Sequence, residues 1–320
     1  MTTPPETILA HLTDIHFPQT PLPTLSELSF KRFFGLLNWH LSRKSMHLTE
    51  TLAAISKDVL SQPFHHLIVS GDLVNLSLLN EYKAGLKWIE QFGASGDISF
   101  VPGNHDYYGP NPLLYPKESM RPSTNLAPVG MSLLPYMISD EKGLELGGAT
   151  GPDLPFVRVV NDVALIGLNS GVPTPLFKAY GKLSETSLDA LKHILIAIQK
   201  ANLYRCVILH HPPLPGITKQ SRGLQNDDLL QSLLRETGAE LVLYGHNHKQ
   251  HHETLRTNTG TCHIVGTPSA SIGQNKRYEL ARYNLFSIRR SADGWTTKMH
   301  GRGLRENHGG VVDLGTSELV

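Results

Sequence analysis

The stretch Val101-Pro102-Gly103-Asn104-His105-Asp106 places an amide, an imidazole and a carboxylate side by side. It begins at the end of the apolar run 98–101, which is typical of a buried strand. Pro102 cannot donate a hydrogen bond to a continuing strand, and Gly103 permits a tight turn. The strand should therefore stop here and present Asn104 and His105 on a loop at its carboxyl end, where open α/β sheets bind ligands. Taken alone, the same residues also occur in ordinary polar turns.

Four further stretches of similar construction follow strand-like runs: Asp14-Ile15-His16, Gly71-Asp72, His210-His211 and Gly245-His246-Asn247-His248. Each has an ordinary alternative, such as a helix-capping aspartate beside a surface histidine. Five strand ends of this kind together indicate a metal site. Mixed carboxylate, imidazole and amide ligands suit manganese, iron or zinc, whereas Mg²⁺ prefers oxygen ligands and water. The lack of cysteine in these stretches argues against a closed structural zinc site.

The chain organisation predicts one α/β domain. Strand-like and helix-like segments alternate up to residue 106, which indicates a sheet built from βαβ units. We expect a single domain over residues 1–300, although 320 residues could also form two. The Pro- and Gly-rich segment 107–153 is predicted to be an inserted cap over the site, and residues 301–320 a loosely held tail.

Composition narrows the possible partners and the expected location. A net charge of +1 argues against non-specific binding of nucleic acid. Two cysteines, Cys206 and Cys262, are too few for a disulfide framework and indicate buried thiols in a reducing compartment. Residues 1–6 lack the pattern of a secretory signal, and no apolar run approaches the ~20 residues that span a bilayer. We therefore expect a cytoplasmic protein.

Residues 30–44 form a basic, aromatic segment that follows the first ligand stretch. Phe30, Phe33, Phe34, Leu37 and Leu41 fall on one face of the predicted helix, flanked by lysines and arginines. Such a stripe most often packs on a core, which is the interpretation we favour. The alternative is peripheral contact with a membrane surface, in which loss of Trp39 would weaken vesicle binding. In either case the segment could form one wall of the site.

In their order along the chain, the five motifs resemble the signature of the calcineurin-like metallophosphoesterase superfamily, over roughly residues 8–270. The resemblance implies an α/β fold, a four-layer α-β-β-α sandwich of two mixed sheets flanked by helices, with a dinuclear metal centre. It implies the following roles: Asp14, His16 and His248 hold one metal; Asn104, His210 and His246 hold the other; Asp72 bridges both; His105, paired with Asp106, faces the scissile phosphate. By the same resemblance the ligand is His210, and not His211.

The substrate is less closely defined. The run His210-His211-Pro212-Pro213-Leu214-Pro215 resembles the branch with cyclic-nucleotide and glycerophosphodiesterases, which implies a phosphodiester cleaved by a metal-bridging hydroxide. The basic aromatic segment favours an alternative, a lipid pyrophosphate hydrolase of the UDP-diacylglucosamine type with a lipid-headgroup substrate. The neutral charge disfavours a nuclease. A non-catalytic scaffold on this fold would lack ligands, and none is missing here.

Overall fold

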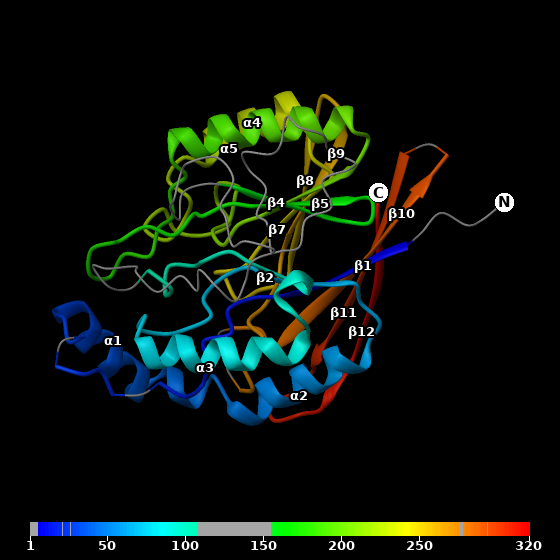
Figure 1. Cartoon of the computed structure of the whole chain (residues 1–320). Coiled ribbons are helices and arrows are strands. Elements are labelled where there is room, and N and C mark those ends of the chain that lie inside the picture. The colour runs from blue at the N-terminus through cyan, green and yellow to red at the C-terminus, as the bar shows by residue number, and fades with distance from the viewer. Residues whose placement is uncertain (1–5, 21, 26, 108–154, 275–277, 293) are drawn as a thin grey trace.

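Two six-stranded sheets pack face to face in the computed structural model, which describes residues 6–20, 22–25, 27–107, 155–274, 278–292 and 294–320. The first sheet has the order β12-β11-β10-β1-β2-β3 and the second β4-β5-β6-β7-β9-β8. Figure 1 shows α1, α2 and α3 on one side of the sheets and α4 and α5 on the other. The predicted four-layer α-β-β-α sandwich is therefore confirmed.

The elements of the first sheet and its helix layer come from both ends of the chain. They are β1 (Glu6–Leu12), α1 (Phe30–Leu41), the 3₁₀ turn Arg43–Ser45, α2 (Thr49–Ser61), β2 (His66–Val69), α3 (Leu79–Ile89), the 3₁₀ turns Glu90–Phe92 and Ser95–Asp97, β3 (Ile98–Phe100), β10 (Arg282–Ser291), β11 (Gly294–Leu304) and β12 (Val311–Leu319). Strands β1, β2 and β3 are parallel, and β10 to β12 are antiparallel to their neighbours.

The second sheet and its helices come from the middle of the chain. They are β4 (Phe156–Val160), β5 (Val163–Gly167), α4 (Glu185–Lys200), β6 (Tyr204–Ile208), α5 (Asp227–Thr237), β7 (Leu241–Tyr244), β8 (His251–Thr257) and β9 (Gly260–Gly266). Strands β5, β6, β7 and β9 are parallel, and β4 and β8 pair antiparallel at the two edges. Both sheets are therefore mixed, as the resemblance implied.

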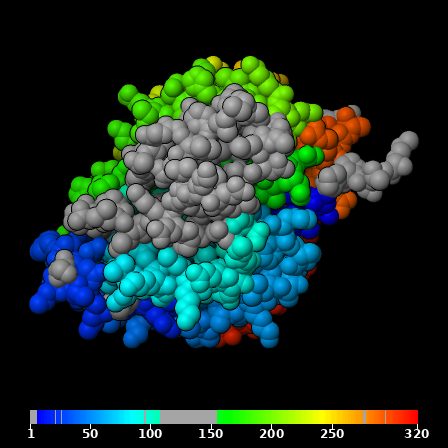
Figure 2. All heavy atoms as spheres, in the orientation of Figure 1, coloured from blue at the N-terminus to red at the C-terminus, as the bar shows by residue number. Residues whose placement is uncertain are grey.

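Three apolar layers hold the sandwich together. One lies between the first sheet and α2 and α3, another between the second sheet and α4 and α5, and the third between the sheets, where Leu9 and Phe286 meet Ile208 and Leu243. Figure 2 shows the α1–α3 side in blue to cyan and the α4 side in green on the same face. This packing fixes the positions of the strand ends that carry the five motifs.

Residues 301–320 differ from the prediction of a loosely held tail, which is wrong. Strand β12 pairs with β11 along nearly its whole length and forms an edge of the first sheet. Leu319 is buried in the layer between the sheets, which gives the strand an apolar anchor that its Gly-rich composition did not reveal. The predicted cap at 107–153 falls, beyond Tyr107, outside the described residues.

Helix α1 also differs from the prediction, because its apolar stripe does not pack on the core. Phe30 is 72% exposed and Leu41 is 77% exposed, whereas the buried positions are Arg32, Gly35 and Trp39. The Arg32 guanidinium is satisfied by the backbone carbonyls of Glu27, Leu76 and Ser77, at 2.7 to 3.0 Å. A buried cation with three acceptors can therefore anchor the helix where the stripe was expected to do so.

Buried His11 in β1 should make the stability of the fold depend on pH. Its ring nitrogens lie 2.7 Å from Ser70 Oγ and 2.9 Å from Thr267 Oγ1, and burial lowers the pKa of the imidazole to about 3. The unfolded chain takes up a proton below about pH 6.5, whereas the folded chain does not, so stability is lost as the pH falls from there towards 3. Between pH 7.5 and 5.5 this one group should lower the free energy of unfolding by about 1.4 kcal/mol.

Urea unfolding of the chelator-treated protein at pH 7.5 and 5.5 measures this effect. The free energy of unfolding of the variant His11→Gln should fall between the two pH values by about 1.4 kcal/mol less than that of the wild type. The control is His193→Gln, because His193 on α4 has a side chain that is 65% exposed. Equal losses in the His11 variant and the wild type would show that this histidine is not the source.

Candidate metal centre

The five predicted ligand stretches meet at one place between the carboxyl ends of β1, β2, β3, β6 and β7. Main-chain hydrogen bonds join them: the Asp14 N–H donates to Gly71 O and the His16 N–H to Asp72 O, both at 2.9 Å. The His246 N–H donates to Asp14 Oδ2 at 2.8 Å, which connects the two sheets. A backbone N–H that donates to a side-chain carboxylate thus joins two motifs that lie 232 residues apart in the sequence.

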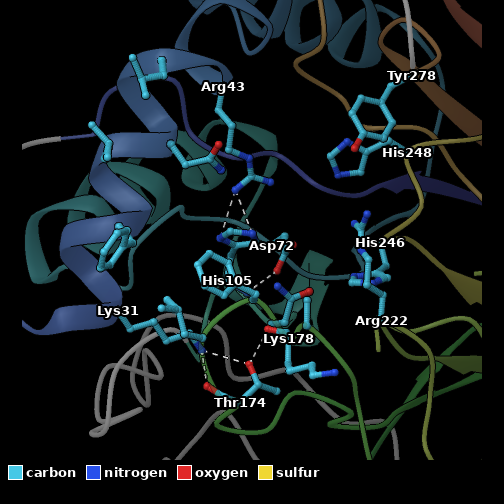
Figure 3. A pocket seen from close by; sticks show the side chains of 18 residues that line it. Lys31, Arg43, Asp72, His105, Thr174, Lys178, Arg222, His246, His248 and Tyr278 are labelled. Carbon is cyan, nitrogen blue, oxygen red and sulfur yellow. Dashed lines mark hydrogen bonds between the residues drawn. The ribbon is translucent and has the colours of Figure 1, made fainter. Parts of the chain in front are cut away.

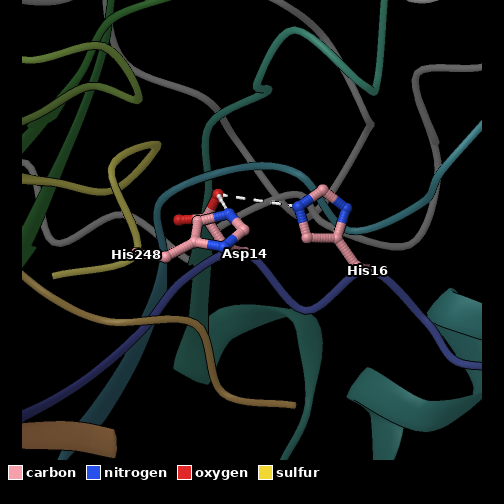
Figure 4. A group of neighbouring side chains, drawn as sticks. All are labelled: Asp14, His16 and His248. Atoms are coloured by element: carbon pink, nitrogen blue, oxygen red, sulfur yellow. Dashed lines mark hydrogen bonds and ion pairs between the residues drawn. The ribbon is translucent and has the colours of Figure 1, made fainter. Parts of the chain in front are cut away.

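Two groups of potential ligands can be distinguished among the described residues. Asp14, His16 and His248 form the first group, which Figure 4 shows, with His248 Nε2 at 3.1 Å and His16 Nε2 at 3.8 Å from Asp14 Oδ1. Asp72, His210 and His246 form the second. Each brings one possible ligand atom per residue within 4.8 Å of the others.

Asp72 lies between the two groups, as a bridging ligand would. Its Oδ2 is 3.6 Å from His16 Nε2 and 3.3 Å from His210 Nε2. Burial opposes ionisation of this carboxyl, but the neighbouring imidazoles, His210 foremost, hold its pKa well below the usual range. The same carboxylate raises the pKa of His210 to about 9 in spite of burial. The site is therefore built around a charged Asp72.

Asn104 and the histidine pair 210–211 also occupy the predicted places. Asn104 is buried beside the centre, and its Oδ1 has no hydrogen-bond partner among the described residues. A buried amide oxygen without a partner fits a metal ligand, because an unpaired polar atom is otherwise costly. His210 lies in the second ligand group, whereas the His211 Nδ1 lies 2.8 Å from Ser170 Oγ.

Backbone conformation marks several of the same positions. Asp14, His16, Asp72, His246 and His248 have φ between 41° and 70°, although none is glycine. Left-handed backbone at non-glycine residues costs energy and is concentrated at functional sites. The two glycines before Asp72 and Asn104 are required by space: an added Cβ on Gly71 would lie 2.6 Å from His210 Nδ1, and one on Gly103 would collide with Asp72 Oδ1. The motif residues therefore adopt conformations that ordinary turns would not favour.

His105 lies beside the metal centre, but its predicted pairing with Asp106 is wrong. Its Nδ1 lies 2.7 Å from the Asn75 carbonyl oxygen, which orients the ring. The Asp106 carboxylate instead accepts hydrogen bonds from the backbone N–H groups of Leu73, Val74 and Gly103, at 2.8 to 3.4 Å. Asp106 thus fixes the loops after β2 and β3, because three backbone donors occupy its oxygens.

Two residues outside the motifs also contact the centre. Arg43, in the turn after α1, places Nη1 2.9 Å from His105 Nε2 and Nη2 3.2 Å from His16 Nε2. His47 is buried, and its ring lies 4.7 Å from that of His16. Arg43 belongs to the basic flank of segment 30–44. The sequence pattern predicted that this segment borders the site, but not that Arg43 contacts His105 and His16. Nothing in the sequence around His47 distinguished it.

A cavity of about 530 Å³ opens onto the centre and is lined by Asp72, Asn104, His105, His246 and His248. Figure 3 shows Arg43 on one side of it and Lys31 on another, hydrogen-bonded to Thr174. Phe34, Leu37 and Leu41 of α1 also line the cavity. The expectation that segment 30–44 forms one wall of the site is confirmed.

Positive groups outnumber negative ones around this cavity. Lys31, Arg43, Lys178 and Arg222 line it, whereas Asp72 is the only acidic residue among the described lining residues. Burial lowers the pKa of His105 to about 3, and the adjacent Arg43 charge acts in the same direction. The cavity therefore suits a negatively charged ligand.

The donor set and its geometry fit two metal ions. The carboxylates of Asp14 and Asp72, the imidazoles of His16, His210, His246 and His248 and the Asn104 amide oxygen match the preferences of a mixed O/N centre. Asp72 contacts histidines of both groups, so one carboxylate can serve both ions. A third potential grouping, His16, Asp72 and His105, shares residues with both of the others.

Comparisons with known proteins identify the fold and the family of the chain. The structure is similar to that of a dimetal phosphatase from Danio rerio, with 13% sequence identity, a TM-score of 0.55 and coverage of 96% of this chain and 98% of the other. It is also similar to a purple acid phosphatase from yellow lupin (Lupinus luteus) seeds, with 12% identity, a TM-score of 0.51 and coverage of 98% of this chain and 53% of that one. No curated protein matches the sequence. Residues 8–250 match the family described as calcineurin-like phosphoesterases, and the chain belongs to that family.

Proposed function

We propose that the chain hydrolyses a phosphodiester with the help of two metal ions. The observation that supports this most is the cavity: it joins two ligand groups that share Asp72 to a positively charged wall and an apolar one. Such a cavity has room for an organic group on either side of a phosphoryl group. Inorganic phosphate alone has no apolar part that could contact the apolar wall.

Seven residues of the chain would bind the two metal ions for such a reaction. Asp14, His16 and His248 would hold one metal, and Asn104, His210 and His246 the other, with Asp72 shared. Metal ions held there supply Lewis-acid stabilisation of phosphoryl charge and activation of a water. For their identity we propose manganese, iron or zinc, because the ligands mix nitrogen and oxygen.

Arg43 and His105 would act on the phosphoryl group itself. Arg43 lies at the cavity wall with its guanidinium against His105, where it can donate hydrogen bonds to phosphoryl oxygens. His105 is held by the Asn75 carbonyl, and the negative charge of a bound phosphoryl group would oppose the effect of Arg43 on its pKa, so that the imidazole can stabilise developing charge or carry a proton to the leaving oxygen. Neither group need move far, because both already line the cavity.

Hydrolysis of bis-p-nitrophenyl phosphate and p-nitrophenyl phosphate, each with Mn²⁺ and with chelator, tests the proposal. We expect kcat/KM for the diester to exceed that for the monoester by about 10-fold, which corresponds to ~1.4 kcal/mol in transition-state binding. Chelator should abolish both activities, and added metal should restore them. Preference for the monoester would contradict the proposal. So would activity that persists in chelator-treated protein that metal analysis shows to be free of metal.

A second candidate is hydrolysis of a lipid pyrophosphate of the UDP-diacylglucosamine type. It is favoured by the apolar side chains of α1 that run from the cavity to the outside, Phe34 and Leu37 among them. Under this alternative the protein should show little activity on either nitrophenyl ester while retaining two metals. Activity on the amphiphilic substrate should then depend on detergent.

A further inference from the structure

Exposed large apolar side chains are concentrated around α1. Among the described residues, eight of the thirteen such side chains belong to the segment 22–41 and to the neighbouring Phe177: Leu22, Leu25, Leu28, Phe30, Phe33, Leu37, Leu41 and Phe177. Ring contacts make part of this set continuous, since Phe34 lies 4.8 Å from Phe30, 5.6 Å from Phe33 and 6.4 Å from Phe177, measured between ring centroids. We call these eight side chains the apolar face.

The apolar face is not needed to attach α1 to the rest of the protein. Arg32 and Trp39 do that from the opposite side of the helix, the first through backbone carbonyls and the second by stacking on His47. Trp39 is only 2% exposed, so it is not the membrane-contacting residue that the sequence had suggested. A continuous exposed apolar patch on a helix with a separate anchor indicates a surface that binds something else.

The charge around the apolar face is positive. Between Leu22 and Thr49 the sequence contains one acidic residue, Glu27, whereas it contains Lys31, Arg43 and Lys44 besides the buried Arg32. Lys44 is exposed in the turn that follows the helix. With a formal charge of only +1 for the whole chain, this segment is a local excess of positive charge. Apolar side chains edged by lysine and arginine are the composition of segments that lie on anionic bilayers.

The position of the apolar face favours a lipid bilayer over a folded protein as its binding partner. Leu37, Leu41 and Phe177 belong both to the apolar face and to the lining of the cavity, so whatever covers the face lies against the cavity mouth. Figure 1 shows α1 at the outer end of its helix layer, where a flat surface can approach it. A folded partner seated there would obstruct the mouth, whereas a bilayer can leave lipid headgroups within reach.

We propose that the apolar face docks the protein on an anionic lipid membrane, with α1 lying in the headgroup region. The described helices include none long and apolar enough to cross a membrane. Phe30, Phe33 and Leu41 enter the interface, and Lys44 contacts anionic headgroups. Docking does not require hydrolysis, and it therefore stands or falls separately from the proposed function.

Co-sedimentation of the full chain with vesicles tests the docking. We expect binding to vesicles of phosphatidylglycerol and phosphatidylcholine, weakening as salt is raised, and at least 10-fold weaker binding to pure phosphatidylcholine. The double variant Phe30→Ser/Phe33→Ser should lose at least 10-fold in binding to the anionic vesicles, and Lys44→Glu should lose severalfold. Neither Phe30 nor Phe33 lines the cavity, so activity on a soluble diester should persist in the double variant and report that it is folded.

The matched control is Leu229→Ser, because Leu229 on α5 is 51% exposed in the opposite helix layer. It should bind vesicles as the wild type does. Failure of the wild type to bind anionic vesicles, or equal binding by the double variant, would overturn the proposal. So would a concentration-dependent dimer in light scattering that the same double variant abolishes, since a second copy would then be the occupant.

Discussion

Replacing Asp72 with alanine is expected to remove both metal ions and to lower kcat/KM by about 10³-fold or more, which is ~4 kcal/mol in transition-state free energy. The reason is its place between His16 and His210, one from each ligand group, at 3.6 and 3.3 Å. Loss of a side chain that only supports a ligand costs roughly 10–100-fold in metal affinity, and loss of a shared ligand should cost more. His210 would also lose the carboxylate that raises the pKa of its imidazole.

Metal content by mass spectrometry, measured together with turnover, distinguishes the possible outcomes. Asp72→Ala should contain fewer than one metal ion per chain, and Asp72→Asn should be intermediate, because its Oδ1 can still accept the His105 N–H hydrogen bond. The control is Asp189→Asn on α4, whose carboxylate is 75% exposed. If Asp72→Ala kept one ion at full occupancy, the shared role of this carboxylate would be wrong.

The strand-end motifs indicated a metal site at the ends of several strands, and the family resemblance that these motifs carry implied the four-layer fold and the ligand set. A strand that ends in Gly-Asn-His-Asp has few ways to continue, and parallel strands bring their carboxyl ends to one edge. This local argument holds for the stretches after β2, β3, β6 and β7, which contain Gly or Pro, whereas Asp14-Ile15-His16 after β1 contains neither. It needs no knowledge of what packs against each strand.

The orientation of α1 could not be predicted in the same way. Periodicity identifies an apolar stripe but does not say which face of the helix is buried, and here Arg32 and Trp39 occupy the inner face. The reason is three carbonyl groups near Glu27, Leu76 and Ser77 that satisfy the guanidinium. Two of these acceptors, Leu76 and Ser77, lie 44 and 45 residues from Arg32 in the sequence and approach it only in the fold.

The hydrogen-bond partner of His105 was misassigned for a related reason. Asp106 follows His105 directly, which suggested a pair, but adjacent side chains on a turn point in different directions. Asn75, thirty residues earlier, supplies the carbonyl that His105 contacts. Arg43 and strand β12 were not predicted because neither belongs to a motif: Arg43 contacts a residue 62 positions away in the sequence, and β12 is held by pairing with β11 within the first sheet.

The variant His105→Ala is expected to keep both metal ions and to lose about 10²–10⁴-fold in kcat, the range typical of a lost general acid or base. Its side chain lines the cavity next to Arg43, where a phosphoryl group would lie. The link between residue 105 and the metal centre is made by the backbone, since the His105 N–H donates to Asp72 Oδ1 at 2.7 Å. Alanine keeps that N–H, so Asp72 should remain in position while the imidazole is lost.

Turnover and metal content measured on the same sample decide between two roles for this histidine. His16, Asp72 and His105 lie close enough together to hold an ion themselves, so the imidazole could instead be a ligand. If His105→Ala lost an ion together with its activity, the ligand role would be correct and the catalytic one wrong. The control His193→Ala, on the exposed side of α4, should retain both metal and turnover. A loss confined to kcat, with two ions still bound, places the imidazole at the reacting phosphoryl group, because removing a residue needed only for metal binding would reduce both measurements.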